Sequence, residues 1–278
     1  MDSKTLITKF DILINKILKI PPDKKKEISR MITNTRSYSI KKFLNISNLF
    51  HSENAINFKP DRHFISYKIS KYLLKNYFRK NMKIADIGGG NGDVIKIIGE
   101  NLNLPRDNLY CVENNSNSWA ESYPFSNGNH IQYIFWDNVT IPNITPQSLD
   151  VVLIMVTLHH MPNDIIQNLF NNLKQLAKPN SLLLLKEHDC KTSDDLYIIN
   201  WEHHLYYIIN SPLLNENNVM KYKETYVDNY KTKSYYDNLL YKNGYVDIIE
   251  FTRLFDKNLH SDKTNATNLY WKVYKKIH

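Results

Sequence analysis

From residue 82 onward, short apolar runs alternate with segments of helical periodicity, and this alternation constrains the fold more than any other feature of the chain. Short apolar runs are typical of strands buried on both faces, and strand–helix alternation is the pattern of a parallel sheet. We expect strands at 82–87, 108–112, 131–135, 149–156, 181–186, 245–252 and 268–276. We expect helices at 92–101, 117–123, 163–177, 194–210 and 232–242. The pattern predicts an α/β fold with a mostly parallel seven-stranded sheet, helices on both faces and an antiparallel pair of strands at the C-terminal end.

The N-terminal part of the chain has a different pattern. Apolar residues recur at helical spacing over 6–18, and Pro21–Pro22 ends that helix before a second one opens. A further amphipathic helix is expected at 61–79, directly before the first strand. We therefore expect residues 1–58 to form a helical N-terminal extension or cap, and residues 59–278 to form the sheet domain.

Four of the seven glycines fall in the segment Asp86-Ile87-Gly88-Gly89-Gly90-Asn91-Gly92, between the first expected strand and the helix that follows. Glycine lets a backbone approach a ligand closely, and a helix start offers free N–H groups and a positive dipole end. A dinucleotide fingerprint would need a third glycine where Asp93 stands, and the chain has no Gly-Lys-Ser/Thr of a P-loop. The loop therefore predicts a ligand site of another type, with tight strand–helix packing as the alternative.

This segment resembles the first motif of the class I S-adenosylmethionine-dependent methyltransferases, in which an acidic residue ends an apolar strand and alternating glycines follow. The match is at Asp86, Gly88, Gly90 and Gly92, and the resemblance covers roughly residues 60–278. It implies a Rossmann-like fold, S-adenosyl-L-methionine as cofactor, and methyl transfer to an O or N acceptor. It also implies that Asp86 and the loop, with Gly89 included, hold the methionine part of the cofactor.

Two acidic positions and one ring add to the expected cofactor site. Glu113 ends the second expected strand, 21 positions after Gly92, where a carboxylate can accept hydrogen bonds from both hydroxyls of a ribose. The resemblance implies that Trp136 stacks on adenine and that Asp137 accepts from its exocyclic amine. The alternatives are a solvated acid at the end of a strand and ordinary packing of the ring.

The run from Leu149 to Met161 resembles the fourth-strand region of many family members, which read Leu-His-His after an apolar strand. The resemblance implies that Val156 contacts the cofactor and that the strand end faces the acceptor. Histidines and carboxylates together could supply a general base, since the pKa of histidine is near neutrality. The candidate catalytic residues are His159, His160, Glu187 and His188. Structural roles and a metal site are the alternatives; because no HExxH or similar spacing is present, we expect no metal.

Composition limits the remaining function classes. Two cysteines allow neither a disulfide scaffold nor a cysteine-based zinc site, and no apolar run approaches the roughly 20 residues of a membrane span. We therefore expect a cytoplasmic protein. The charge of +8 favours anionic partners in general. The expected partner is a small-molecule acceptor; the alternatives are RNA, including a cap, and a non-catalytic role in binding the cofactor or another protein.

Overall fold

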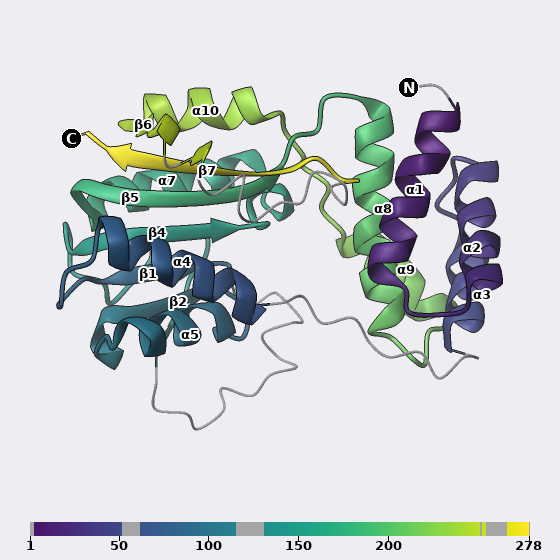
Figure 1. The fold of residues 1–278 in the computed structure, drawn as a ribbon, viewed down its shortest axis with the longest axis horizontal. Coiled ribbons are helices and arrows are strands. Elements are labelled where there is room, and N and C mark those ends of the chain that lie inside the picture. Colours follow the sequence, from purple (N-terminus) through teal and green to yellow (C-terminus); the bar gives the residue numbers. More distant parts are fainter. Residues whose placement is uncertain (1–2, 52–61, 115–130, 251, 254–265, 278) are drawn as a thin grey trace. The chain divides into compact units, whose positions relative to one another are not determined.

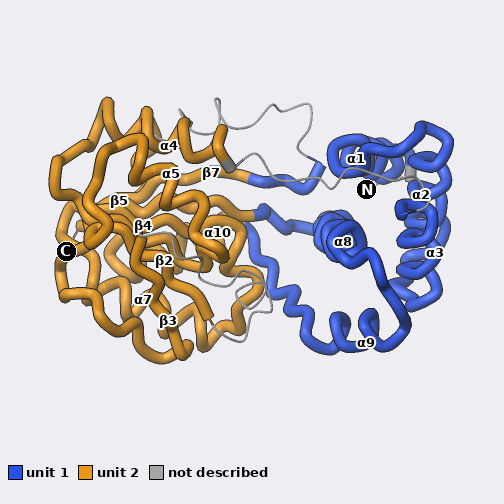
Figure 2. Tube along the Cα trace, turned by 90° about the horizontal axis from the view of Figure 1, so that it is seen from below, with its two compact units in different colours: residues 1–60, 188–232, 260–269 blue, residues 61–187, 233–259, 270–278 orange. Residues whose placement is uncertain are grey.

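The structure is a computed structural model, and it describes residues 3–51, 62–114, 131–250, 252–253 and 266–277 (Figure 1). The helix expected at 117–123 lies outside these residues. The chain forms two compact units, shown in different colours in Figure 2. Unit 1 contains residues 1–60, 188–232 and 260–269, and unit 2 contains residues 61–187, 233–259 and 270–278.

Unit 2 is built on a seven-stranded sheet, which confirms the fold class that the sequence predicts. The strands are β1 (Ile84–Ile87), β2 (Leu109–Glu113), β3 (Gln132–Phe135), β4 (Leu149–Met155), β5 (Ala177–His188), β6 (Tyr245–Asp247) and β7 (Leu269–Lys276). Their order is β3-β2-β1-β4-β5-β7-β6. The first five strands pair in parallel, and β6 pairs with β7 antiparallel. The strand order reverses between β1 and β4, and ligands of such sheets bind outside the carboxyl ends of the strands at this point.

Helices cover both faces of the sheet (Figure 1). They are α4 (Arg62–Asn76), α5 (Asp93–Leu102), α7 (Asn163–Leu176) and α10 (Lys233–Lys242). Side chains alternate along β4: Val151 and Leu153 pack with α4 and α5, whereas Val152 and Ile154 pack with α7 and α10. Because both faces are covered, the middle of the central strands is apolar, as in Val151–Met155 of β4 and Leu182–Leu185 of β5. These residues therefore appear in the sequence as continuous apolar runs.

The strand expected at 245–252 is shorter than the sequence pattern indicates. β6 ends at Asp247, and residues 249–250 and 252–253 are helical. The backbone N–H of Thr252 donates to the carbonyl of Ile248, four residues earlier, and the Thr252 hydroxyl donates to Asp247 Oδ1 at 2.7 Å. This local hydrogen bonding closes a helical turn where the apolar pattern alone predicted an extended strand.

Unit 1 is helical. Its helices are α1 (Ser3–Ile17), α2 (Pro22–Asn34), α3 (Ile40–His51), α8 (Ser193–Ile209) and α9 (Glu216–Thr225). One apolar core joins them, in which Phe10 of α1 and Phe43 of α3 are fully buried with Trp201 of α8. The division after residue 58 into a helical extension and a sheet domain stays a prediction, and that boundary lies outside the described residues. Unit 1 also contains residues 188–232, whose helix α8 contributes Trp201 to this core.

Among the helices of the described residues, none is both long enough and apolar enough to cross a lipid bilayer.

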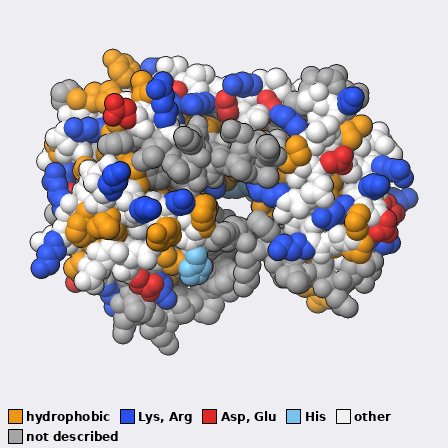
Figure 3. Space-filling view, viewed as in Figure 1, with side chains coloured by type: hydrophobic (Ala, Val, Ile, Leu, Met, Phe, Trp, Pro, Cys, Tyr) orange, Lys and Arg blue, Asp and Glu red, His pale blue; other side chains and the backbone are white. Residues whose placement is uncertain are grey.

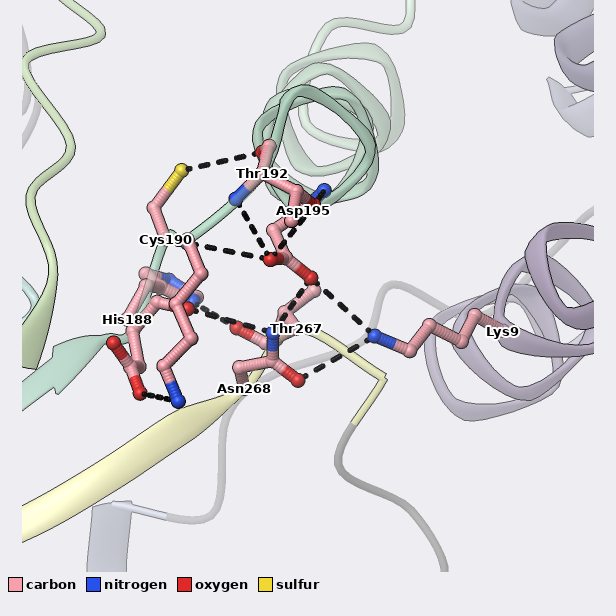
Figure 4. Close-up of polar contacts among 9 residues, drawn as sticks. Lys9, His188, Cys190, Thr192, Asp195, Thr267 and Asn268 are labelled. Atoms are coloured by element: carbon pink, nitrogen blue, oxygen red, sulfur yellow. Dashed lines mark hydrogen bonds and ion pairs between the residues drawn. The ribbon is translucent and has the colours of Figure 1, made fainter. Parts of the chain in front are cut away.

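A polar cluster ties three stretches of unit 1 together at the start of α8 (Figure 4). Thr192 and Asp195 form a reciprocal capping box: the Thr192 hydroxyl accepts from the Asp195 N–H at 3.1 Å, and Asp195 Oδ2 accepts from the Thr192 N–H at 3.0 Å. Asp195 Oδ1 accepts from Asn268 Nδ2 at 2.8 Å and lies 3.5 Å from Lys9 Nζ. A single carboxylate thus connects α1, α8 and the segment before β7.

This arrangement makes the stability of unit 1 depend on pH through Asp195. Burial alone raises the pKa of Asp195, but hydrogen bonds from Thr192 and Asn268 together with the charge of Lys9 outweigh burial, so the pKa is lowered. A carboxyl group whose pKa is lowered on folding stabilises the fold above its unfolded pKa of about 3.9. That contribution is lost as the pH falls through the folded pKa.

We expect Asp195→Asn to destabilise the protein by about 1–2 kcal/mol at neutral pH, because a charge-assisted acceptor is lost. The difference from wild type should begin to shrink as the pH falls below about 4, the unfolded pKa. It should be smallest below the lowered folded pKa, where the wild-type carboxylate is protonated in the folded protein as well. Urea unfolding of wild type and Asp195→Asn, at neutral pH and at acid pH, measures this difference in the free energy of unfolding. A difference that stays the same at neutral and acid pH would contradict this role for Asp195.

Candidate functional site

The loop between β1 and α5 has the backbone conformation that only glycine adopts readily. Gly88, Gly90 and Gly92 have φ values of 67°, 58° and 74°, in the left-handed region. These are the three alternating glycines of the sequence motif; Gly89, between them, has no positive φ. The Gly88 N–H donates to the carbonyl of Val112 in β2, so the loop starts from the sheet in a defined position. The motif therefore has a glycine at every second position because every second residue of the loop has a left-handed backbone conformation.

The space around the glycines differs from one to the next. A Cβ atom at Gly88 would lie 2.3 Å from the Thr157 side chain, and one at Gly92 would lie 2.3 Å from Ile131. A Cβ at Gly89 would lie 2.9 Å from the sulfur of Cys111 and 3.0 Å from the Asp86 carboxylate. Among the described residues, no atom lies within 4 Å of the position of a Cβ at Gly90. Within that part of the chain Gly90 borders open space, whereas its neighbours are packed against the end of the sheet.

Two carboxylates flank this loop from β1 and β2. Asp86 is buried at the end of β1, directly beneath Gly89. Glu113, the last residue of β2, accepts a hydrogen bond from the Gly90 N–H at 2.8 Å and from the Asn114 N–H at 3.0 Å. The loop and Glu113 are therefore in direct contact, as expected for two parts of one site.

Side chains that the sequence reasoning did not single out support the loop from below. The Tyr133 hydroxyl donates to the carbonyl of Asn91 at 2.9 Å, and the Cys111 thiol lies 3.7 Å from the carbonyl of Gly90. Burial, with smaller contributions from nearby carboxylates, raises the pKa of Cys111, which is therefore a neutral packing group. Cys111 lies two positions before Glu113, and Tyr133 lies two positions before Phe135, the last residues of their strands. The period of two along a strand was therefore the available signal.

The third strand places Trp136 and Asp137 differently from each other. Trp136 is 1% exposed, within the core that α7 covers. Asp137 is exposed, and its Oδ1 accepts from the N–H groups of Thr140 and Val139, which lower its pKa. Phe135 is paired in register with Glu113 and is 50% exposed. Of these two rings, Phe135 is the one available for stacking.

The end of β4 turns sharply. Val156, the first residue after β4, has φ 55°, which is costly for a β-branched residue. Its N–H donates to the carbonyl of Lys186 in β5 at 2.7 Å. Strained conformations of this kind persist where surrounding contacts impose them, and they cluster at functional sites. The turn leads into the short helix η2 (Leu158–His160).

Glu187 at the end of β5 holds this turn. Its Oε1 accepts from the backbone N–H groups of Thr157 at 2.8 Å and Leu158 at 2.7 Å. Its Oε2 lies 2.7 Å from Nδ1 of His159. Glu187 and His159 are both fully buried, whereas His160 is exposed, with its ring centroid 4.1 Å from that of His159. The structure therefore brings Glu187 and His159 together and leaves His160 at the surface.

The fourth candidate catalytic residue, His188, belongs to unit 1. Its Nδ1 lies 2.9 Å from the carbonyl oxygen of Thr267, as Figure 4 shows, and its Nε2 lies 3.9 Å from Glu202. Because the carbonyl can only accept, Nδ1 carries the proton in this contact. The ring is buried, and these contacts link β5 to the segment that precedes β7.

Comparisons with known proteins identify the fold. A scan against family models and a search of curated proteins both return no match. A chain of the complex between the Haloferax volcanii Trm112 methyltransferase activator and a methyltransferase is similar, with a TM-score of 0.51 and 12% identity, covering 78% of this chain and 92% of that chain.

Two further solved structures are similar to this chain at slightly lower TM-scores. A SAM-dependent methyltransferase from Archaeoglobus fulgidus has a TM-score of 0.48 and 14% identity, covering 79% of this chain and 96% of its own. A sarcosine dimethylglycine methyltransferase from Galdieria sulphuraria has a TM-score of 0.47 and 12% identity, covering 76% of this chain and 83% of its own. The strand order, the glycine loop at the switch point and the similarity to the chain of the Haloferax volcanii complex show that this chain has a Rossmann-like methyltransferase fold.

Proposed function

We propose that the protein is an S-adenosylmethionine-dependent methyltransferase that methylates an oxygen or nitrogen atom of a small-molecule acceptor. The observation that carries this proposal is the loop at 88–92, with its alternate left-handed glycines and the open space beside Gly90. The contact of Glu113 with the Gly90 N–H places an acidic group beside that space. A glycine loop and a carboxylate at the ends of adjacent parallel strands form a fitting site for a nucleoside-containing cofactor.

Each expected cofactor contact has a place in this arrangement. The loop and Asp86 would hold the methionine part of the cofactor, and the turn at Val156 would border it. Glu113 would accept hydrogen bonds from the ribose hydroxyls, since a carboxylate is an acceptor with several acceptor positions. We assign adenine stacking to Phe135 in place of Trp136, because Phe135 is exposed beside Glu113.

When bound, the cofactor would supply a methyl group on a positively charged sulfur for transfer to an acceptor lone pair. The protein's own contribution is to orient the two reactants and to exclude water. The buried ends of β1, β4 and β5 provide a rigid frame for this positioning. No group that stabilises a developing negative charge is required, since the sulfonium charge is neutralised in the reaction.

His159 is the residue best placed to take a proton from the acceptor. With Glu187 accepting from Nδ1, the basic ring nitrogen of His159 is Nε2, and a carboxylate partner makes an imidazole more basic. Both oxygens of Glu187 are engaged in the turn, so we assign Glu187 a positioning role. His160, exposed next to His159, would orient the acceptor. The contacts of His188 with Thr267 and Glu202 lie in unit 1, and its catalytic role stays a prediction.

RNA is the second candidate acceptor, favoured by the net charge of +8. The two classes differ in salt dependence. Binding of a single strand weakens with a log–log slope of roughly −0.7 per phosphate neutralised, whereas binding of a neutral small molecule is nearly independent of salt. Titration of a short capped RNA at low salt and at about 200 mM salt separates them.

Isothermal titration calorimetry with S-adenosylmethionine and S-adenosylhomocysteine tests the cofactor. We expect saturable binding of both, and no binding of NAD, since Asp93 replaces the third glycine of the dinucleotide fingerprint. Acceptor pools incubated with radiolabelled methyl donor then test transfer. If neither ligand gives a calorimetric signal or a thermal shift, the proposed function is wrong; binding without transfer to any pool would favour the non-catalytic alternative.

A further inference from the structure

Helix α4 presents large apolar side chains to solvent on the side that faces away from the sheet. Phe64, Tyr67 and Leu74 are 44%, 54% and 58% exposed. With Lys71 and Lys75, which are also exposed, they fall on one side of the helix, because residues three, four and seven apart share a face. We call these five residues the α4 outer face. It runs about 16 Å along the helix at 1.5 Å per residue.

The inner side of α4 packs against the sheet and α5. Ile69, Tyr72 and Leu73 are buried in the core with α5 and the sheet. The apolar residues of the outer face are therefore additional to those that the fold requires. A soluble domain rarely exposes several large apolar side chains side by side, and such patches mark interaction surfaces.

The α4 outer face lies in a stretch of the chain that has basic residues and no acidic residue. Residues 63–85 contain six basic residues and no acidic residue: Lys68, Lys71, Lys75, Arg79, Lys80 and Lys83. The neighbouring α5 contributes the exposed acid Glu100. Hydrophobic and basic side chains are interspersed over α4 in Figure 3. The partner of this face must therefore be both apolar and anionic.

Two contacts between a cation and an aromatic ring, and a shallow hollow, lie in this basic stretch. Lys68 Nζ lies 5.2 Å from the ring centroid of Phe64, and the Arg79 guanidinium lies 5.7 Å from that of Tyr77. A shallow hollow of about 360 Å³, lined by residues 74–79, opens at the end of the helix. Cationic groups thus flank both the apolar stripe and the hollow, where the phosphate of a head group could sit.

We propose that the α4 outer face binds the surface of an anionic lipid bilayer. Aromatic and aliphatic side chains enter the boundary between head groups and acyl chains, while lysines attract the anionic head groups. A second copy of the chain fits poorly, because two such faces would bring their lysines together. Single-stranded RNA would use the two rings for stacking, but it offers nothing to Leu74, the most exposed of the three apolar side chains.

Vesicle co-sedimentation of the full chain tests the proposal and does not depend on the methyltransferase function. We expect binding to vesicles of phosphatidylcholine with about 30% phosphatidylserine, and little binding to phosphatidylcholine alone. Lys71→Gln with Lys75→Gln should weaken binding about 25-fold, at roughly fivefold per lysine. Tyr67→Ser with Leu74→Ser should weaken it at least about tenfold.

The control pair Tyr241→Ser with Lys242→Gln removes one exposed ring and one exposed lysine from α10 and should bind as wild type. Thermal midpoints equal to that of wild type would show that the variants fold. Wild-type protein that stays in solution with anionic vesicles, or α4 variants that bind as wild type, would overturn the proposal. So would a short single-stranded RNA probe whose binding the α4 variants lose while vesicles bind no protein, since the face would then serve nucleic acid.

Discussion

Replacement of Gly90 by valine should reduce the affinity for S-adenosylmethionine at least about a hundredfold, which corresponds to 2.7 kcal/mol or more. Gly90 has φ 58°, and the position of its missing Cβ borders open space, so a branched side chain would fill the volume assigned to the ligand. It would also strain the backbone whose N–H donates to Glu113. Calorimetry of the variant against wild type measures the loss.

Gly244 offers a matched control for the backbone strain. Its φ is 82°, and it lies between α10 and β6, away from the glycine loop. A left-handed conformation costs a non-glycine residue roughly 1–2 kcal/mol, so Gly244→Val should lose stability as well. It should nevertheless bind the cofactor as wild type does. Full affinity in Gly90→Val would show that the ligand does not occupy the space beside the loop.

Glu187→Gln should destabilise unit 2 by about 2–4 kcal/mol. The Glu187 carboxylate accepts from two backbone N–H groups and from the imidazole of His159 in a fully buried position. Glutamine retains one acceptor oxygen and directs an NH₂ group at donors that need an acceptor. The strained turn at Val156 would then lose the contacts that impose it.

Urea unfolding measures the loss of stability in Glu187→Gln. Glu100→Gln, on the exposed side of α5, is the control, because it also replaces a carboxylate by an amide. That control should stay within about 0.5 kcal/mol of wild type. If methyl transfer survives in Glu187→Gln, its pH profile should change, since His159 would lack its carboxylate partner. A variant as stable as wild type would show that Glu187 does not hold the turn.

Most of the fold could be predicted because its strands are buried on both faces. Apolar runs identified all seven strands, and the runs Val151–Met155 in β4 and Leu182–Leu185 in β5 left little ambiguity. The end of β6 was misplaced because a Thr252 side chain, not hydrophobicity, decides it. Helix α9 was missed because only Val219 of its residues is buried, so it has no apolar periodicity to detect.

The site could be predicted where backbone conformation requires a residue type. Glycines at every second position, followed by a carboxylate at the end of the next strand, can be recognised in the sequence by their spacing. The structure places Gly90 and Glu113 in contact. The assignment of adenine stacking to Trp136 stays a prediction. The burial of Trp136 and the exposure of Phe135 could not be derived from the sequence, because neighbouring residues in a strand face opposite ways and a shift of one position exchanges their faces. The boundary between the two units, which falls between Glu187 and His188, could not be predicted, because both residues belong to the same strand.

The position of β7 has a consequence for biosynthesis. It follows the other six strands along the chain, yet it lies between β5 and β6 in the sheet. Until β7 has been translated, one edge of β5 lacks its neighbouring strand. The apolar residues Leu182–Leu185 lie in this strand. Open apolar edges recruit other chains, so the nascent protein passes through an aggregation-prone stage until this strand is added. A premature stop before Leu269 would make that stage permanent, and quality control would meet a nearly complete domain with an unpaired strand.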